Sequence, residues 1–121
     1  MTKTVLVVED HPANLRLMRE ILETRDYRIV TAENGLEVID IARAQRPDLV
    51  LLDLQLPGAS GLDIADRMRS DDELKTIPIV ATTAFLTPTI EDDIRDSGCV
   101  AYLPKPFSVD VLLRTVDSIL R

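Results

Sequence analysis

The sequence holds a single cysteine, Cys99, so no internal disulfide can form. It also lacks a secretory signal at its start and any long apolar run. The continuous apolar stretches at residues 5–8 and 49–52 are far shorter than the roughly 20 residues that a membrane span needs. We therefore expect a protein of the reducing cytoplasm that does not insert into membranes.

Positive charge is scarce, with 14 Lys and Arg against 21 Asp and Glu, which gives a net charge of −7. A surface of that sign repels phosphate backbones and anionic lipids, so direct binding to nucleic acid is disfavoured. The 45% hydrophobic and 29% charged content excludes disordered and collagen-like chains. We expect one compact domain over residues 1–121, without repeats, linkers or an attached output domain.

Five short apolar runs predict strands, at residues 4–8, 28–31, 49–52, 79–82 and 101–103. Segments with apolar residues at helical spacing follow each run. In the second of these helices the buried face would comprise Leu36, Ile39 and Ala42. Pro12 and Pro88 suit first helical turns, and residues 60–63 resemble a capping box.

The alternation of strands and helices predicts an α/β fold. Strands that are apolar throughout are typical of a parallel sheet covered by helices on both faces. Right-handed crossovers then leave few topologies. We predict a doubly wound, flavodoxin-like sheet of five parallel strands in the order 2-1-3-4-5.

Charged and polar residues stand where the predicted strands end: Glu9, Asp10, Asp53, Thr83 and Lys105. In this fold ligands bind at the carboxyl edge, where the strand order reverses. Two carboxylates about 5 Å apart repel by roughly 3 kcal/mol at an effective dielectric constant near 20. Three clustered acids therefore need a cation or raised pKa values, and oxygen ligands favour Mg²⁺.

The charges at this edge favour phosphoryl chemistry. Three carboxylates, one Mg²⁺ and Lys105 sum to zero, whereas phosphorylation of one carboxylate adds about one negative charge. The Thr83 hydroxyl and the Lys105 ammonium are available to contact the added oxygens. The central position of Asp53 makes it the expected phosphoacceptor.

Several of these residues stand in a pattern that also includes an aromatic residue and a short loop motif: Glu9-Asp10, Asp53 to Pro57, Gly61, Thr83-Ala84, Tyr102 and Lys105-Pro106. The combination, in strand order, resembles the CheY-like receiver domain of bacterial response regulators over essentially the whole chain. The match rests on the joint occurrence of these elements.

The resemblance implies that Asp53 takes a phosphoryl group from a phosphohistidine of a sensor kinase or phosphotransferase. It implies a Mg²⁺ site formed by Asp10, Asp53 and the backbone carbonyl of Gln55, with Glu9 acting through metal-bound water. A bond between Lys105 and Pro106 in the cis form is also implied.

Thr83 and Tyr102 correspond to the pair that switches conformation on phosphorylation in the family. Gln55 and Phe85 occupy positions that influence how easily water attacks the phosphoryl group, and we expect Phe85 to shield it. Pro104 departs from the family pattern, and an edge position of the fifth strand would accommodate it.

The whole pattern is similar to the DivK-type single-domain regulators of cell-cycle and polarity control. It implies an output by protein contact through the fourth helix, fifth strand and fifth helix. A receiver module of a hybrid kinase or phosphorelay, and a Mg²⁺-dependent aspartyl-phosphate phosphohydrolase, are the alternatives. The absence of a cap domain or substrate loops argues against the hydrolase, so we expect no enzyme beyond self-phosphorylation and self-dephosphorylation.

Three other features have simpler interpretations. His11, directly before Pro12, is expected to cap a helix at the rim of the site. Cys99 is expected to be a small packed residue whose thiol pKa is not lowered. The acidic residues at 91–93 are expected to favour a helix N-terminus through its dipole.

Overall fold

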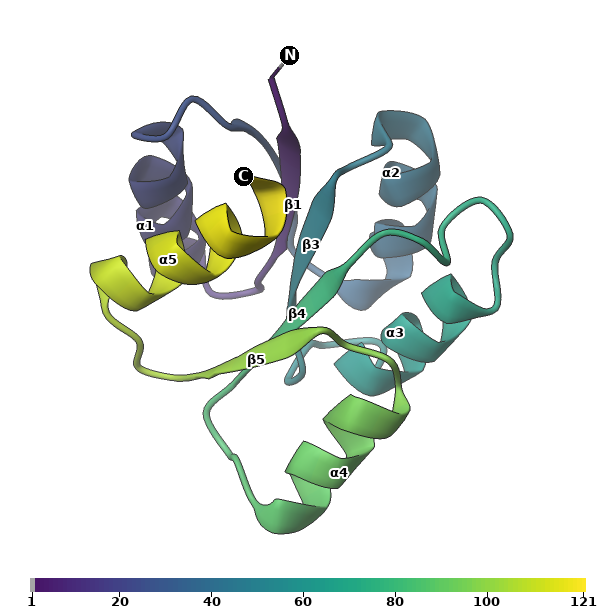
Figure 1. Cartoon of the computed structure of the whole chain (residues 1–121). Coiled ribbons are helices and arrows are strands. Elements are labelled where there is room, and N and C mark those ends of the chain that lie inside the picture. Colours follow the sequence, from purple (N-terminus) through teal and green to yellow (C-terminus); the bar gives the residue numbers. More distant parts are fainter. Residues whose placement is uncertain (1) are drawn as a thin grey trace.

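The computed structural model describes residues 2–121 and alternates strands with helices along the chain. Helices cover both faces of one central sheet, with α1 and α5 on one side and α2, α3 and α4 on the other (Figure 1). The elements are β1 Thr4–Val8, α1 Pro12–Glu23, β2 Arg28–Ala32, the 3-10 turn η1 Gly35–Glu37, α2 Val38–Gln45, β3 Leu49–Asp53, α3 Gly61–Arg69, β4 Ile79–Thr83, α4 Pro88–Asp96, β5 Ala101–Pro104 and α5 Val109–Leu120.

The sheet is parallel and has the order β2-β1-β3-β4-β5, which confirms the predicted topology. The order in which successive strands are added reverses at β1: β2 lies on one side of β1, and β3, β4 and β5 follow on the other. The register pairs Asp53 with Thr82 and Thr83 with Pro104, so the ends of β3, β4 and β5 lie side by side. This edge is where the predicted site residues stand.

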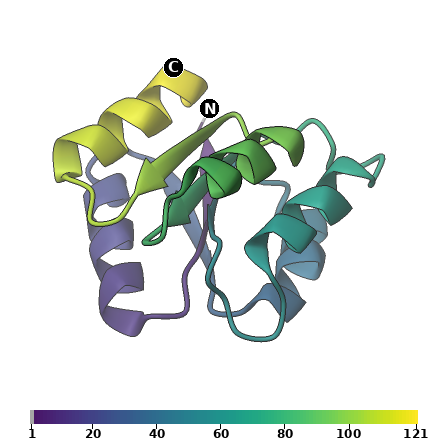
Figure 2. The same cartoon turned by 90° about the horizontal axis from the view of Figure 1, so that it is seen from below.

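Apolar side chains fill the space on both sides of the sheet. Every residue of β1, β3 and β4 is buried, as expected for strands covered on both faces. Leu22 of α1 and Val116 of α5 belong to one core cluster, Ile64 and Met68 of α3 belong to a second, and Ile94 of α4 belongs to a third, smaller one. The two helical layers on either side of the sheet are clear in the turned view (Figure 2).

The strands differ from their predicted bounds mainly at their carboxyl ends. β3 and β4 each continue one residue further, into Asp53 and Thr83. β5 extends through Pro104, whose ring removes a backbone donor. Because β5 is an edge strand paired only with β4, no further strand needs that donor.

Two sequence predictions on helix starts are wrong. Leu36 does not belong to a buried helical face: its side chain is 71% exposed, because residues 35–37 form a separate 3-10 turn and α2 begins only at Val38. Ser60 makes no side-chain cap at α3, where the Gly61 N–H instead donates to the Leu54 carbonyl (3.4 Å). Pro12 and Pro88 do stand in first helical turns.

No helix within residues 2–121 combines the length and apolar character that crossing a membrane requires.

Candidate functional site

The site is an ion cluster formed where three parallel strands end. Glu9 follows β1, Asp53 ends β3 and Lys105 follows β5. The Lys105 Nζ lies 2.6 Å from Glu9 Oε1 and 3.0 Å from Asp53 Oδ2, so it donates to both carboxylates. Both carboxylate residues are only 2% exposed. The bond between Lys105 and Pro106 is cis, as the family resemblance implies.

Burial and neighbouring charges shift the pKa values of Asp53, Glu9 and Lys105. Burial, with a hydrogen bond to Glu9, raises the pKa of Asp53 to about 6, against the opposing effects of the Gln55 N–H and Lys105. Burial also disfavours the charged forms of Glu9 and Lys105. Their hydrogen bonds outweigh it, so the pKa of Glu9 is lowered and that of Lys105 is raised.

The raised pKa of Asp53 predicts a pH-dependent stability of the metal-free protein. Between pH 4 and pH 6 the folded chain keeps a proton that the unfolded chain releases, so stability falls as the pH rises through this window. Asp53→Asn should therefore raise the free energy of unfolding by about 2 kcal/mol at pH 8 in EDTA and change it little at pH 4. Urea unfolding at both pH values measures this.

The exposed carboxylate Asp72 supplies the matched control, because Asp72→Asn removes the same charge where solvent screens it. Its effect should be small at both pH values. If Asp53→Asn and the parent chain were equally stable at pH 8, the ionised Asp53 carboxylate would not destabilise the fold, and the prediction would be wrong.

The acidic groups fit a hard divalent cation. Carboxylate oxygens of Glu9, Asp10 and Asp53 lie within 4.8 Å of one another, with Asp10 exposed beside the two buried residues. An all-oxygen donor set open to solvent on one side suits Mg²⁺. The Gln55 N–H donates to Asp53 Oδ1 (2.9 Å), so the loop after β3 passes beside this carboxylate. The metal-binding role of the Gln55 carbonyl stays a prediction.

A second network joins the loops after β3 and β4. The Gln55 side-chain amide donates to Thr83 Oγ1 (2.9 Å) and accepts from the Ala84 N–H (3.2 Å). The Phe85 N–H also donates to Thr83 Oγ1 (3.1 Å). Sequence reasoning placed Thr83 at the site but missed the contacts of the Gln55 side chain, for which an isolated glutamine in a loop gives no signal.

Two predicted residues lie at the periphery. Tyr102 is 39% exposed, and its hydroxyl donates to Glu91 of α4 at 3.4 Å, so its part in a switch stays a prediction. His11 precedes α1, but its side chain caps no helix, which corrects our interpretation. Its backbone N–H instead donates to Glu9 Oε2 at 3.3 Å, because the turn after β1 brings that N–H to the carboxylate.

Glu91 and Cys99 follow the sequence interpretation, whereas Asp92 and Asp93 lie beyond the first turn of α4. Glu91 lies in the first turn of α4, where the helix dipole favours negative charge. Burial raises the pKa of the Cys99 thiol, as expected of a packed cysteine.

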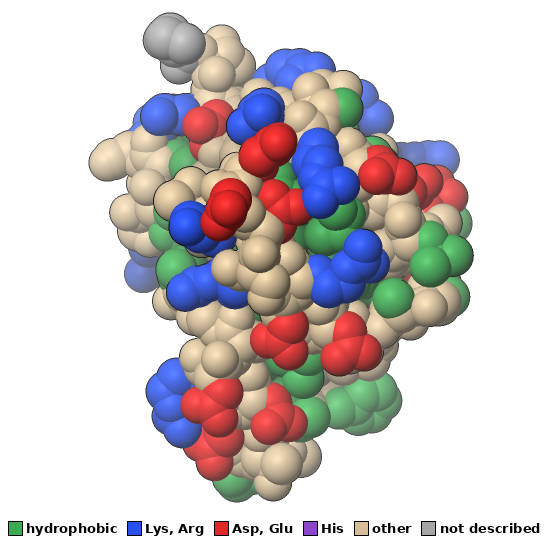
Figure 3. All heavy atoms as spheres, turned by 90° about the vertical axis from the view of Figure 1, so that its right-hand side faces the viewer, with side chains coloured by type: hydrophobic (Ala, Val, Ile, Leu, Met, Phe, Trp, Pro, Cys, Tyr) green, Lys and Arg blue, Asp and Glu red, His purple; other side chains and the backbone are tan. Residues whose placement is uncertain are grey.

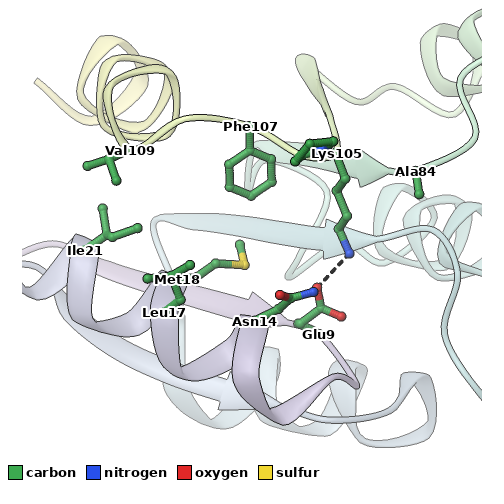
Figure 4. A pocket seen from close by; sticks show the side chains of 10 residues that line it. Glu9, Asn14, Leu17, Met18, Ile21, Ala84, Lys105, Phe107 and Val109 are labelled. Carbon is green, nitrogen blue, oxygen red and sulfur yellow. Dashed lines mark hydrogen bonds and ion pairs between the residues drawn. The ribbon is translucent and has the colours of Figure 1, made fainter.

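A pocket of about 290 Å³ adjoins the ion cluster between α1 and the segment that joins β5 to α5. Glu9 and Lys105 lie at one end, and Leu17, Ile21 and Val109 lie at the other (Figure 4). Leu17 and Val109 are about half exposed, at 54% and 52%. The charged site is therefore continuous with an accessible apolar hollow.

The acidic cluster stands where the strand order of a 2-1-3-4-5 sheet reverses, which is where sheets of this kind bind their ligands. Comparison of the sequence decides the class: residues 5–117 match the response regulator receiver domain, and the chain belongs to this family. It is 45% identical over 120 residues to the polar-differentiation response regulator DivK of Brucella anthropi. The match covers 99% of this chain and 98% of that relative.

Solved structures agree with the fold. The chemotaxis protein CheY4 of Vibrio cholerae superimposes with a TM-score of 0.92 at 25% identity, covering 98% of this chain and 99% of that one. The receiver domain of the sensor histidine kinase PA1611 from Pseudomonas aeruginosa has a TM-score of 0.90 at 28% identity, covering 99% and 98%. That second structure holds a magnesium ion coordinated in its active-site cleft.

Proposed function

We propose that residues 1–121 act as a single-domain response regulator with Asp53 as the phosphoacceptor. The observation that carries this is the Lys105 ammonium held between the buried carboxylates of Glu9 and Asp53. Such a cluster places a nucleophilic carboxylate beside an ammonium group that can form an ion pair with the added phosphoryl oxygens. Membership of the receiver family supports the same role.

In the proposed reaction an ionised Asp53 oxygen attacks the phosphorus of a phosphohistidine. The new O–P bond forms as the N–P bond breaks, and the imidazole nitrogen keeps the bonding electron pair. Glu9, Asp10 and Asp53 would hold Mg²⁺, together with the Gln55 carbonyl and with Glu9 acting through water. A bound divalent cation would supply neutralisation of charge on the transferred phosphoryl oxygens. Lys105 and Thr83 would contact those oxygens.

The test uses acetyl phosphate and Mg²⁺ followed by intact-mass measurement. We expect a phosphate-sized adduct in the parent chain and none in Asp53→Asn. Asp72→Asn, an exposed carboxylate away from the cluster, should still form the adduct. An adduct of equal yield in Asp53→Asn would refute the assignment.

Phe85 provides a prediction on phosphate lifetime. Phe85 is 70% exposed and its N–H donates to Thr83 Oγ1, so it stands at the rim of the site. Phe85→Ala should accelerate loss of the phosphoryl group several-fold, because water reaches the acyl phosphate more freely. The decay of the mass adduct measures this, with the exposed Val100→Ala as control. If the phosphorylated adduct of Phe85→Ala had the same half-life as that of the parent chain, Phe85 would not shield the phosphoryl group.

The proposed output is a change in protein contacts on the face of α4, β5 and α5, with Thr83 and Tyr102 as the switch. On this face Val100, Tyr102 and Val111 are exposed. Acidic side chains gather over α4 at the lower end of the view in Figure 3. Exposed apolar side chains together with the acidic α4 suit a partner that carries apolar and basic side chains.

The upstream partner in this proposal is a sensor histidine kinase or a histidine phosphotransferase of the cytoplasm. The similarity to DivK supports a role in cell-cycle or polarity control. The chain's own catalysis is limited to its phosphorylation and dephosphorylation.

A further inference from the structure

The Gln55 side chain ties two loops of the site together. Its amide nitrogen donates to the Thr83 hydroxyl oxygen, and its amide oxygen accepts from the Ala84 N–H. The Gln55 backbone N–H is bonded at the same time to Asp53 Oδ1. One residue thus connects the phosphoacceptor carboxylate with the end of β4.

One of these contacts occupies a donor that a phosphorylated Asp53 needs, and the other fixes the position of a second donor. Phosphorylation adds negative oxygens beside the Thr83 hydroxyl and the Ala84 N–H, which are the neutral donors at the end of β4. Lys105 is already bonded to both buried carboxylates, so further donors are of particular value. The Gln55 amide oxygen therefore competes for the Ala84 N–H, while its amide nitrogen, which donates to Thr83 Oγ1, leaves the Thr83 hydroxyl hydrogen free but ties that side chain to the loop after β3.

We propose that the Gln55 amide is a latch that holds Thr83 and Ala84 in the unphosphorylated arrangement and is displaced by the phosphoryl group. Gln55 is therefore a positioning residue for the response to phosphorylation. The proposal rests on the phosphoacceptor function of Asp53. It differs from shielding by Phe85, because the latch acts on the equilibrium between two conformations.

A latch that stabilises only the unphosphorylated form lowers the affinity for a phosphoryl group by its own contribution. Removing its two hydrogen bonds should strengthen binding of a phosphoryl mimic by roughly five- to tenfold. A residue that contacted the phosphoryl group itself would give the opposite sign. The direction of the change separates the two roles.

The experiment titrates beryllofluoride, a stable mimic of the acyl phosphate, into the full chain in the presence of Mg²⁺. Gln55→Met keeps the length of the side chain and removes its hydrogen-bonding amide. Gln55→Asn keeps the amide but is too short to span the loops, which provides a second variant if the first folds poorly. Gln45→Met, whose amide is bonded to Arg28 on the surface, is the matched control.

We expect the dissociation constant of beryllofluoride to fall at least fivefold in Gln55→Met and Gln55→Asn and to be unchanged in Gln45→Met. The Ala84 amide resonance of ligand-free Gln55→Met should also move toward its position in the beryllofluoride-bound parent chain. Equal or weaker binding with an unmoved Ala84 resonance would overturn the latch alone. Failure of the parent chain to bind beryllofluoride would overturn the phosphoacceptor function and the latch together.

Discussion

Lys105→Met should destabilise the metal-free protein by about 2–3 kcal/mol at pH 8, because it leaves the Glu9 and Asp53 carboxylates buried without their cation. Without Lys105 both carboxyl pKa values rise above those of the unfolded chain. Stability then falls as the pH rises, so the deficit should shrink at pH 5. Saturating Mg²⁺ should also restore stability, because it binds the folded form alone.

Urea unfolding at pH 5 and pH 8, with EDTA or with Mg²⁺, measures these effects. The control is Lys75→Met, since Lys75 pairs on the surface with the fully exposed Asp72 and should contribute less than about 1 kcal/mol. A deficit of Lys105→Met that is the same at both pH values would indicate lost packing and contradict the charge-based account.

Gly61→Ala is expected to cost about 2–4 kcal/mol of stability and to slow phosphorylation of Asp53. A Cβ atom at position 61 would lie 2.6 Å from the backbone oxygen of Asp53 and 2.7 Å from the Cα of Leu54. Backbone atoms cannot turn aside as a side chain can. The start of α3 would have to move away from β3, and Asp53 would move with it.

Gly35→Ala is the matched comparison. A Cβ atom at position 35 would lie 2.6 Å from Cδ1 of Ile64, which is the end of a flexible side chain and can move aside. It should lose less stability and phosphorylate at the parent rate. Urea unfolding and the time course of the acetyl phosphate adduct test both variants. Parent-like stability and rate in Gly61→Ala would show that α3 can move without disturbing Asp53.

Strong patterns in the sequence were sufficient to predict the sheet and its charged edge. Residues 49–52 are apolar without interruption and end in Asp53, so burial of the strand brings the carboxylate into the site. The same reasoning applies to β1 and Glu9. The fixed topology then brings together residues that are distant in sequence, such as Glu9 and Lys105.

Features that depend on the conformation of a local turn, or on how closely two loops approach each other, could not be predicted from the sequence. Leu36 has the spacing of a helical core residue, but Asn34 accepts a hydrogen bond from the Leu36 N–H and starts a separate turn. The bridge from Gln55 to Thr83 depends on how closely two loops approach across the edge of the sheet. A neutral polar residue in a loop carries no periodic signal of such a contact.

The most direct test of the phosphoacceptor assignment is to locate the modified residue. The chain is incubated with phosphoramidate, a donor with an N–P bond, and Mg²⁺, and is then treated with borohydride, which reduces an acyl phosphate to an alcohol. Peptide mass spectrometry should find homoserine in place of Asp53. Homoserine at Asp10 or at another aspartate, with Asp53 unchanged, would contradict the account.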